Sequence, residues 1–268
     1  MLLCWNFINM RYGLFISGAL FVFCTVCTGN ETKTSPNQAL QGQFLIGAGV
    51  LVKEEAYTGI DLKVYPLPFI SYIGQKWSLQ GTQFRYSLTG EDNFSVNTIL
   101  KLRTEGYDAD DSSALDGMSD RDASLDAGLG LTVSGKWGSL GTDLLTDAAG
   151  RHKGQEIRLT YSRQFRELGG GIENLGVGPF AGISWRSSSL NDYYYGVRYG
   201  EVRPGRPAYD SSDSTDFFAG IRLDYRLNEK WTLFTMFQTQ WLGSEITDSP
   251  IVDRHHMSSF IAGLVYRL

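Results

Sequence analysis

Three histidines could exchange protons near neutral pH: His152, His255 and His256. A hydrolase would need a histidine beside a nucleophile and an orienting acid. Asp147 and His152 flank one turn, but no spacing ties Ser162 or Ser184 to them as the nucleophile. The chain also lacks a G-x-S-x-G motif and a histidine pair at metal-ligand spacing. We therefore predict a turn histidine without a catalytic task, no enzyme activity, and no metal or cofactor.

The segment 106–122 is acidic and could attract a divalent cation. Its aspartates are Asp108, Asp110, Asp111, Asp116, Asp120 and Asp122. A calcium loop of the helix-loop-helix kind needs glycine at its sixth position and a terminal glutamate. Counting from Asp108, the sixth residue is Ser113, so the motif fails. We predict a solvated external loop, with loose cation binding at the lipopolysaccharide surface as the alternative.

Charged residues also recur at alternate positions within otherwise apolar segments. Successive side chains of a strand point to opposite faces, so these charges would share the inner face of a sheet. In a small barrel they could pair into a network that fills the lumen, or line a narrow channel. We predict the network and keep the channel as the alternative. The set is Asp126, Glu156, Arg158, Arg186, Arg222, Asp224 and Arg226.

Aromatic and basic side chains gather in the segment 188–211. The cluster comprises Tyr193, Tyr194, Tyr195, Arg206 and Tyr209. Such residues could bind a ligand or a partner by stacking. They could equally join an interfacial aromatic belt or pack the loop over the mouth of a barrel, and we predict this second role.

The elements that would position all these residues are strands. In the segment 255–268, an apolar row at period two comprises Phe260, Ala262, Leu264, Tyr266 and Leu268. Residues 231–241 place a tryptophan at each end of a similar row. Segments of about ten residues with this alternation and aromatic ends are typical of transmembrane β-barrels. A soluble β-sandwich is the alternative.

Twelve strands are predicted, at 43–53, 58–65, 67–74, 76–88, 93–105, 121–135, 136–147, 152–167, 174–187, 212–227, 230–245 and 255–268. The stretch 57–74 is the weakest, because Pro66 and Pro68 each remove a ladder donor and the flanking strands are short for a span. We predict an all-β, closed antiparallel transmembrane barrel. Ten strands, with this stretch folded inward or along a rim, is the alternative.

Loop lengths predict which way the barrel faces. Outer-membrane barrels keep short turns on the periplasmic side and long loops outside. The reversals at 86–94 and 225–231 are tight, whereas 106–120, 188–211 and 246–254 are long and polar. We therefore expect both chain ends to lie in the periplasm.

The N-terminal residues have the features of a targeting segment. Arg11 precedes an uncharged apolar run over 12–27, which is short for a spanning helix and ends in small residues. We predict a signal peptide over 1–29, a periplasmic lead-in over 30–41 and the barrel over 42–268. All three cysteines lie in this leader, so no disulfide framework is expected. The formal net charge of −5 offers no basic stripe for nucleic acid.

Short motifs in a fixed order span residues 43–268. They are Tyr57-Thr-Gly59, Pro66-Leu-Pro68, Gly106-Tyr-Asp108, Leu115-Asp-Gly-Met-Ser-Asp-Arg121, Thr146-Asp147 with His152 and Gly154, Leu190-Asn-Asp-Tyr-Tyr-Tyr-Gly-Val197, Arg206-Pro207 with Tyr209, and Asp248-Ser-Pro-Ile-Val252. The chain in this respect resembles the MltA-interacting protein family, also called the MipA/OmpV family of Gram-negative outer-membrane proteins. It departs from many outer-membrane chains, which end in phenylalanine, by ending in Leu268.

The resemblance implies an outer-membrane β-barrel without catalytic residues. It also implies a scaffold that joins a lytic transglycosylase to a bifunctional penicillin-binding protein during murein synthesis. We accordingly predict a non-enzymatic outer-membrane protein, in contact with lipid and lipopolysaccharide, that binds proteins at its periplasmic rim. The candidate rim segments are 30–41, 89–93, 168–173 and 228–230. A small-solute channel is the alternative, and an outer-membrane hydrolase is the third possibility.

Overall fold

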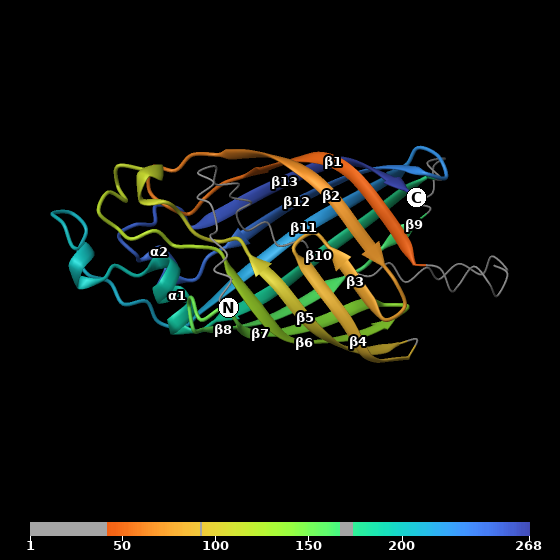
Figure 1. Cartoon of the computed structure of the whole chain (residues 1–268), viewed down its shortest axis with the longest axis horizontal. Coiled ribbons are helices and arrows are strands. Elements are labelled where there is room, and N and C mark those ends of the chain that lie inside the picture. The colour runs from red at the N-terminus through yellow and green to blue at the C-terminus, as the bar shows by residue number, and fades with distance from the viewer. Residues whose placement is uncertain (1–41, 92, 167–173) are drawn as a thin grey trace, which may run out of the picture.

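The period-two alternation produces one sheet of thirteen strand segments, drawn in Figure 1. The computed structural model describes residues 42–91, 93–166 and 174–268. The predicted signal peptide 1–29, the lead-in 30–41 and the rim segment 168–173 lie outside the described residues. In the part of the chain that is described, none of the helices has the length and apolar composition needed to cross a membrane.

The strand segments are β1 (Gln43–Lys53), β2 (Lys63–Ile73), β3 (Trp77–Gln80), β4 (Gln83–Glu91), β5 (Phe94–Arg103), β6 (Ser124–Gly135), β7 (Gly138–Asp147), β8 (Gln155–Ser162), β9 (Phe165–Arg166), β10 (Leu175–Arg186), β11 (Ser214–Arg226), β12 (Trp231–Trp241) and β13 (His256–Arg267). The pairing of β10 with β11 closes the sheet. Both β8 and β9 pair with β10, so they form one interrupted strand of the wall. The fold is therefore a closed antiparallel barrel of twelve strands, which confirms the predicted class.

The predicted boundaries are wrong around the two prolines. Instead of two strands over 58–65 and 67–74, the single strand β2 runs through Pro66 and Pro68. The predicted strand 76–88 is divided into β3 and β4 by a tight turn in which Gly81 has a φ of 57°. Glycine adopts this backbone conformation without the clash that a Cβ would cause. The two errors compensate each other, so the total of twelve is correct.

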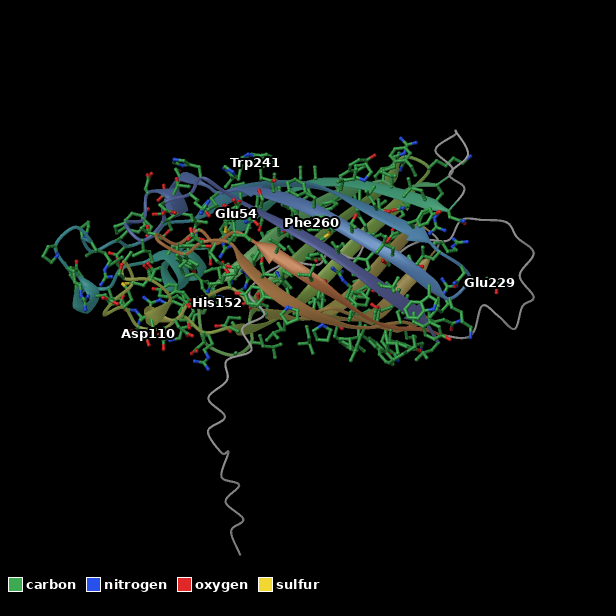
Figure 2. The ribbon with its side chains drawn as sticks, turned by 90° about the horizontal axis from the view of Figure 1, so that it is seen from above. Glu54, Asp110, His152, Glu229, Trp241 and Phe260 are labelled. Atoms are coloured by element: carbon green, nitrogen blue, oxygen red, sulfur yellow. The ribbon has the colours of Figure 1, made fainter. Side chains whose placement is uncertain are left out.

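The barrel has one end with short connections and one end with long ones. The short connections 74–76, 136–137 and 227–230 form the turn end. The long connections 54–62, 104–123, 148–154, 187–213 and 242–255 form the loop end. The loop end also holds the helices α1 (Ser188–Tyr195) and α2 (Ser244–Thr247) and the 3₁₀ turns η1 (Ala109–Asp111) and η2 (Tyr199–Glu201). In Figure 2, Glu229 and Asp110 lie toward these opposite ends.

The outer face of the wall is an apolar belt. Large hydrophobic side chains that are exposed along it include Leu129, Leu144, Ile157, Ile221, Phe237, Phe260 and Leu264. Aromatic pairs mark the turn end, with ring centroids 4.9 Å apart for Trp231 and Tyr266 and 3.9 Å apart for Tyr72 and Trp77. An apolar band edged by aromatic rings is how such barrels meet lipid.

Both apolar and charged side chains project into the interior. An apolar group, the lumen apolar cluster, comprises Leu51, Leu67, Phe69, Phe180, Phe218, Phe234, Met236, Ile261 and Val265. A second apolar group lies outside the barrel wall, among the long loops. Buried charged residues of the strands, such as Lys101, Arg103 and Glu156, also lie in the lumen.

Candidate functional site

Four of the five long loops pack their apolar side chains together into a cap over the loop end. Its buried hydrophobic residues, here the loop cap, are Ala56, Tyr57, Ile60, Tyr107, Leu115, Met118, Leu190, Tyr194, Tyr195, Val197, Ile246, Ile251 and Val252. An isolated bridge between Tyr57 and Val252 ties two of the loops together, and a bridge between Val197 and Tyr209 closes the loop 187–213 on itself. Loops that share a hydrophobic core are held in one arrangement, because separating them would expose their apolar side chains to water.

Two arginines fix the loops from inside the cap. Arg206 donates to the carbonyl oxygens of Glu201, Ala114 and Asp116 at 2.6 to 3.1 Å. Arg121 is 1% exposed and donates to both carboxylate oxygens of Glu201, at 3.0 and 3.2 Å. Burial alone would raise the pKa of Glu201, but the hydrogen bonds from Arg121 and from backbone N–H groups outweigh it and lower the pKa to about 2.

Beneath the cap lies a buried set of ion pairs, here the lumen network, centred on Arg103. Arg103 donates through Nε to Asp126 Oδ2 at 2.8 Å and through Nη1 to Glu105 Oε1 at 2.8 Å. It also donates through Nη2 to Glu156, which in turn accepts from Lys101 Nζ at 3.3 Å. One guanidinium thus binds three carboxylates, two on the wall strands β6 and β8 and one in the loop after β5, and strands β5, β6 and β8 are joined through the lumen.

Arg186 connects this network to the cap. Its Nη2 donates to Glu105 Oε2 at 2.6 Å, and its Nε donates to Asn191 Oδ1 of α1 at 3.1 Å. Burial would raise the pKa of Glu105, but Arg186 and Arg103 outweigh it and lower the pKa to about 2. Glu156 has its other oxygen occupied by Ser184 Oγ at 2.7 Å. Ser184, one of the two serines considered for the hydrolase alternative, is therefore engaged as a hydrogen-bond donor.

The seven predicted lumen charges occupy three different surroundings. Four of them, Asp126, Glu156, Arg158 and Arg186, are buried at the loop-end half of the lumen. Arg222 pairs with Asp224 at 2.7 Å, and both side chains are about one-fifth exposed, at 21% and 20%. Arg226, expected in the lumen, is instead exposed, because it is the last residue of β11 and lies at the turn end of the barrel.

Sequence reasoning missed the centre of the network. The inner row of β5 includes Lys101 and Arg103, which are 4% and 2% exposed, and Glu105 follows in the next loop. The signal was present, because Leu100 and Leu102 alternate with these residues and face outward. The same alternation that identified Arg158 on β8 would have identified them.

Arg158 differs from the other buried arginines. It is 4% exposed, its guanidinium carbon lies 3.5 Å from the centroid of the Phe218 ring, and its nearest carboxylate contact is Glu156 at 4.0 Å. Among the described residues, its Nε and Nη2 have no hydrogen-bond partner. Burying a guanidinium with two unpaired N–H donors is unfavourable in free energy, so Nε and Nη2 can donate to an anionic ligand or to water.

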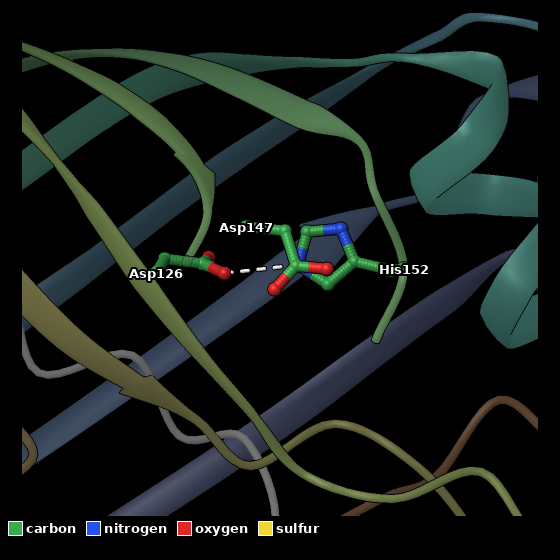
Figure 3. A group of neighbouring side chains, drawn as sticks. All are labelled: Asp126, Asp147 and His152. Atoms are coloured by element: carbon green, nitrogen blue, oxygen red, sulfur yellow. Dashed lines mark hydrogen bonds and ion pairs between the residues drawn. The ribbon is translucent and has the colours of Figure 1, made fainter. Parts of the chain in front are cut away.

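His152 belongs to a structural hydrogen-bond group, shown in Figure 3. Its Nε2 lies 2.9 Å from Asp126 Oδ1, and its Nδ1 accepts the Gly154 N–H at 3.1 Å. These contacts indicate the tautomer that carries its proton on Nε2, because Nδ1 is already an acceptor. Ser162 lies at the opposite end of β8 from the turn that carries His152. The ring therefore has no free nitrogen aimed at a nucleophile.

Asp126, Asp147 and His152 bring ligand atoms within 4.8 Å of one another, the spacing a metal ion would need. Their lone pairs are already in use. Asp147 accepts from the N–H groups of Ala149, Gly150 and Lys153 at 2.7 to 2.9 Å and so caps its own turn. Asp126 also accepts from Arg103, whose positive charge would repel a cation. These residues fit a hydrogen-bonded turn better than a metal site.

The aromatic cluster predicted in the segment 188–211 is part of the cap. Tyr194 and Tyr195 of α1 are 0% and 3% exposed, and Arg206 is 6% exposed. Tyr209 donates to the Glu245 carbonyl at 3.0 Å, and Tyr193 lies beside Tyr194 with ring centroids 4.8 Å apart. Burial raises the pKa of Tyr194 and Tyr195. These rings pack the loops over the mouth of the barrel.

A small polar cavity remains beneath the cap. It has a volume of about 60 Å³ and is lined by residues that include Lys53, Glu55, Glu105, Arg186, Gln238 and Gln240. This is room for a few water molecules. The loop cap and the lumen network lie over the described lumen at the loop end.

Comparison with known proteins gives the chain its relatives. The family model described as MltA-interacting protein MipA matches residues 46–268. The MltA-interacting protein of Escherichia coli (strain K12) is 30% identical over 231 residues, which cover 85% of this chain and 91% of that protein. Outer membrane protein Omp26La of Vibrio anguillarum is 28% identical over 245 residues, which cover 91% of this chain and 93% of that protein.

Outer membrane protein OmpV of Vibrio cholerae is 27% identical over 245 residues, again with 91% of this chain and 93% of the relative covered. Among solved structures, the NanC porin covers 84% of this chain and all of its own at 8% identity and a TM-score of 0.41, too distant to bear on function. Relatives named as outer-membrane proteins and a closed barrel with an apolar belt place the chain in the outer membrane of a Gram-negative bacterium. The chain belongs to the MltA-interacting protein (MipA) family.

Proposed function

We propose that this protein is a non-enzymatic scaffold that binds murein enzymes at its turn end, which short turns mark as the periplasmic side. The printed name of the relative in Escherichia coli, 30% identical to this chain, supports a lytic transglycosylase as one partner. A penicillin-binding protein as the second partner follows only from the family role that the sequence motifs imply.

The observation that carries the proposal is a ring of exposed basic residues at the turn end, here the basic rim. Its members are Lys76, Lys136, Arg163, Arg166, Arg226, Lys230 and Arg267. Among the exposed residues of the described turns 74–76, 136–137 and 227–230, Glu229 is acidic, so the described part of the rim has an excess of positive charge although the whole chain is at −5. Exposed charge of one sign steers an oppositely charged partner and sets its orientation. An acidic protein face fits this surface.

The rim is also well formed. Asn228 accepts the N–H groups of Lys230 and Trp231, each at 2.9 Å, and so fixes the turn between β11 and β12. Lys230 Nζ donates to Tyr266 Oη at 3.0 Å, and this hydrogen bond raises the pKa of Lys230. A partner would meet a pre-ordered surface and would not have to pay for ordering it.

The capped loop end argues against the alternative of a small-solute channel. The loop cap and the lumen network lie across the path that a solute would need. The hydrolase alternative has no support from His152, whose two ring nitrogens are both engaged. A scaffold role therefore fits a capped barrel with a charged periplasmic rim better than either alternative does.

A crosslinking pull-down tests the scaffold directly. The full-length protein would be crosslinked in native outer membranes and captured, and murein hydrolases and synthases would be identified by mass spectrometry. Charge reversal of Arg226 and Lys230 to glutamate should abolish capture, whereas the same change at Lys153, exposed at the loop end, should not. Recovery of no murein enzyme with the unaltered protein would end the scaffold proposal.

A further inference from the structure

The hydrogen-bonded wall of the barrel is incomplete beside β2. On one side β2 pairs with β1 along its whole length, from Lys63 to Ile73. On the other side its register with β3 covers only Ser71 to Ile73. The described part of β2 from Lys63 to Ile70 therefore has no strand partner on that side, and we call this interval the seam. Figure 1 shows β2 separated there from β3 and β5.

The seam exists because the β3–β4 hairpin is short. It turns back at Gly81, with four residues in β3, while the flanking strands β2 and β5 have 11 and 10. The last described backbone bond between the hairpin and β5 runs from the Leu102 N–H to the Thr82 carbonyl at 2.9 Å. On the loop-end side of the hairpin, β2 and β5 are wall neighbours, and no strand of the described residues lies between them.

Two prolines lie on the open edge itself. The Gly74 N–H donates to the Trp77 carbonyl, so the even-numbered residues of β2 point their backbone groups toward β3 and the seam. Pro66 and Pro68 belong to this even-numbered set and present no N–H there. An added strand would need those donors, so the edge is unsuited to pairing with a second chain. Because these prolines have no N–H, the open edge also leaves fewer unpaired donors in hydrocarbon, which lowers its free-energy cost.

The seam lies at the level of the apolar belt. Outward-facing residues on its two sides are exposed and apolar, namely Val64 and Ile70 on β2 at 60% and 56%, and Leu100 and Leu102 on β5 at 44% and 45%. At its loop end the seam is bridged by Lys63 Nζ to Asp111 Oδ2 at 2.9 Å and by Ser112 Oγ to the Thr58 carbonyl at 2.8 Å. The unpaired edge is thus bridged at its loop end and borders lipid tails along the belt.

The side chains behind the seam are also apolar. Leu67 and Phe69 point inward from the open edge and belong to the lumen apolar cluster. Tyr65 packs against that cluster and stays partly exposed, so it is the side chain that an entering molecule would displace. Phe218 of the same cluster is covered by Arg158, the buried guanidinium with two unused donors among the described residues.

We propose that the seam is a lateral entry for a single-chain amphiphile with an anionic head, such as a fatty acid, from the outer leaflet. Its acyl chain lies against the lumen apolar cluster, and its carboxylate accepts from Nε and Nη2 of Arg158. This binding is separate from any protein contact at the basic rim, because the two surfaces lie on different faces of the molecule.

The test uses the full-length protein in lipid nanodiscs, with hexadecanoic acid that carries a photoreactive diazirine at its terminal carbon. Crosslinks mapped by mass spectrometry should fall on inward residues such as Leu67, Phe69 and Phe234. Arg158→Gln should weaken binding of the acid about tenfold, through loss of charge-assisted hydrogen bonds, and leave the matching hexadecanol unchanged. Arg222→Gln, which alters a lumen arginine already paired with Asp224, is the matched control.

A second variant tests the route without altering the binding residues. Four residues inserted between Gln80 and Gln83, together with Pro66→Val and Pro68→Val, should extend the hairpin and pair the open edge. This zipped protein should load the acid at least tenfold more slowly than the unaltered one, a change of about 1.4 kcal/mol in barrier.

Three results would overturn the proposal. Crosslinks confined to belt residues such as Phe260 and Leu264 would show that the acid stays in the surrounding lipid. Equal loss of acid and alcohol binding in Arg158→Gln would remove the carboxylate contact. Crosslinks from Val64 to a second copy of the chain would assign the edge to an oligomer interface. The mapping on the unaltered protein remains decisive even if a variant fails to fold.

Discussion

Arg103 on β5 and Asp126 on β6 meet inside the barrel, with 2.6 Å between Nη2 and Oδ2, and both side chains are almost completely excluded from solvent. The same guanidinium also binds Glu105 and Glu156. A single buried cation therefore neutralises three carboxylates that the fold brings together from distant positions in the chain. We therefore expect the lumen network to weaken when this residue is removed.

Replacing Arg103 by leucine should destabilise the barrel by about 3–5 kcal/mol, because removing one partner leaves buried carboxylates unpaired. The measurement is denaturant unfolding in detergent micelles, followed by tryptophan fluorescence. Arg85→Leu is the matched control, since the ion pair of Arg85 with Asp143 is only partly buried, with side chains 23% and 16% exposed. It should cost about 1 kcal/mol. Equal losses for the two variants would contradict the central role of Arg103.

Acid should loosen the loop cap before it affects the strands. The pKa values of Glu105 and Glu201 are both lowered from 4.5 to about 2. A group whose pKa is lower in the folded state stabilises it above the ordinary value and loses that effect as pH falls toward the folded value. The contribution of these two groups to the free energy of unfolding should therefore be constant above about pH 4.5 and fall between about pH 4.5 and 2. The loss that comes from Glu105 should be about 3 kcal/mol.

Protease cleavage of the loops, measured across this pH range, reports the loosening. The variant Glu201→Gln should be cleaved more readily at neutral pH and should show a weaker pH dependence. Loops that stay resistant down to pH 2 in the unaltered protein would contradict the assignment.

Supplying donors to the open edge should be harmful. The double variant Pro66→Val and Pro68→Val adds two N–H groups that face hydrocarbon along the seam, each costing about 1–3 kcal/mol if it stays unpaired. Ile70→Val, on the same outward row, changes no donor and should cost under about 1.5 kcal/mol. Thermal unfolding by heat-dependent gel migration measures both. A double variant that is as stable as the parent and remains monomeric would show that the edge is not exposed to lipid.

The loop cap should keep the barrel electrically closed. Planar-bilayer recordings of the unaltered protein should show a closed baseline, and Arg226→Ala should not change it, because this side chain lies on the rim. Leu190→Asp places a charge at a fully buried cap position and should produce openings, since the cap must unpack to hydrate it. A steady conductance in the unaltered protein would support the channel instead.

The sequence by itself determined the barrel. Alternation at period two is a local property, and it is strong enough in β6, β11 and β13 to assign both faces of each strand. The inward placement of Asp126, Glu156, Arg158 and Arg186 follows from the same parity. Turn and loop lengths, also local, separated the two ends.

Only the tertiary structure decided which of these charges meet and where the wall is interrupted. Arg103 reaches Glu156 across 53 positions of sequence, and no local pattern encodes that contact. Pro66 and Pro68 look like strand breakers until the register shows that their missing donors face a gap. Periodicity fixes the face on which a side chain lies, whereas its partner depends on closure of the sheet, which brings strands together from the whole length of the chain.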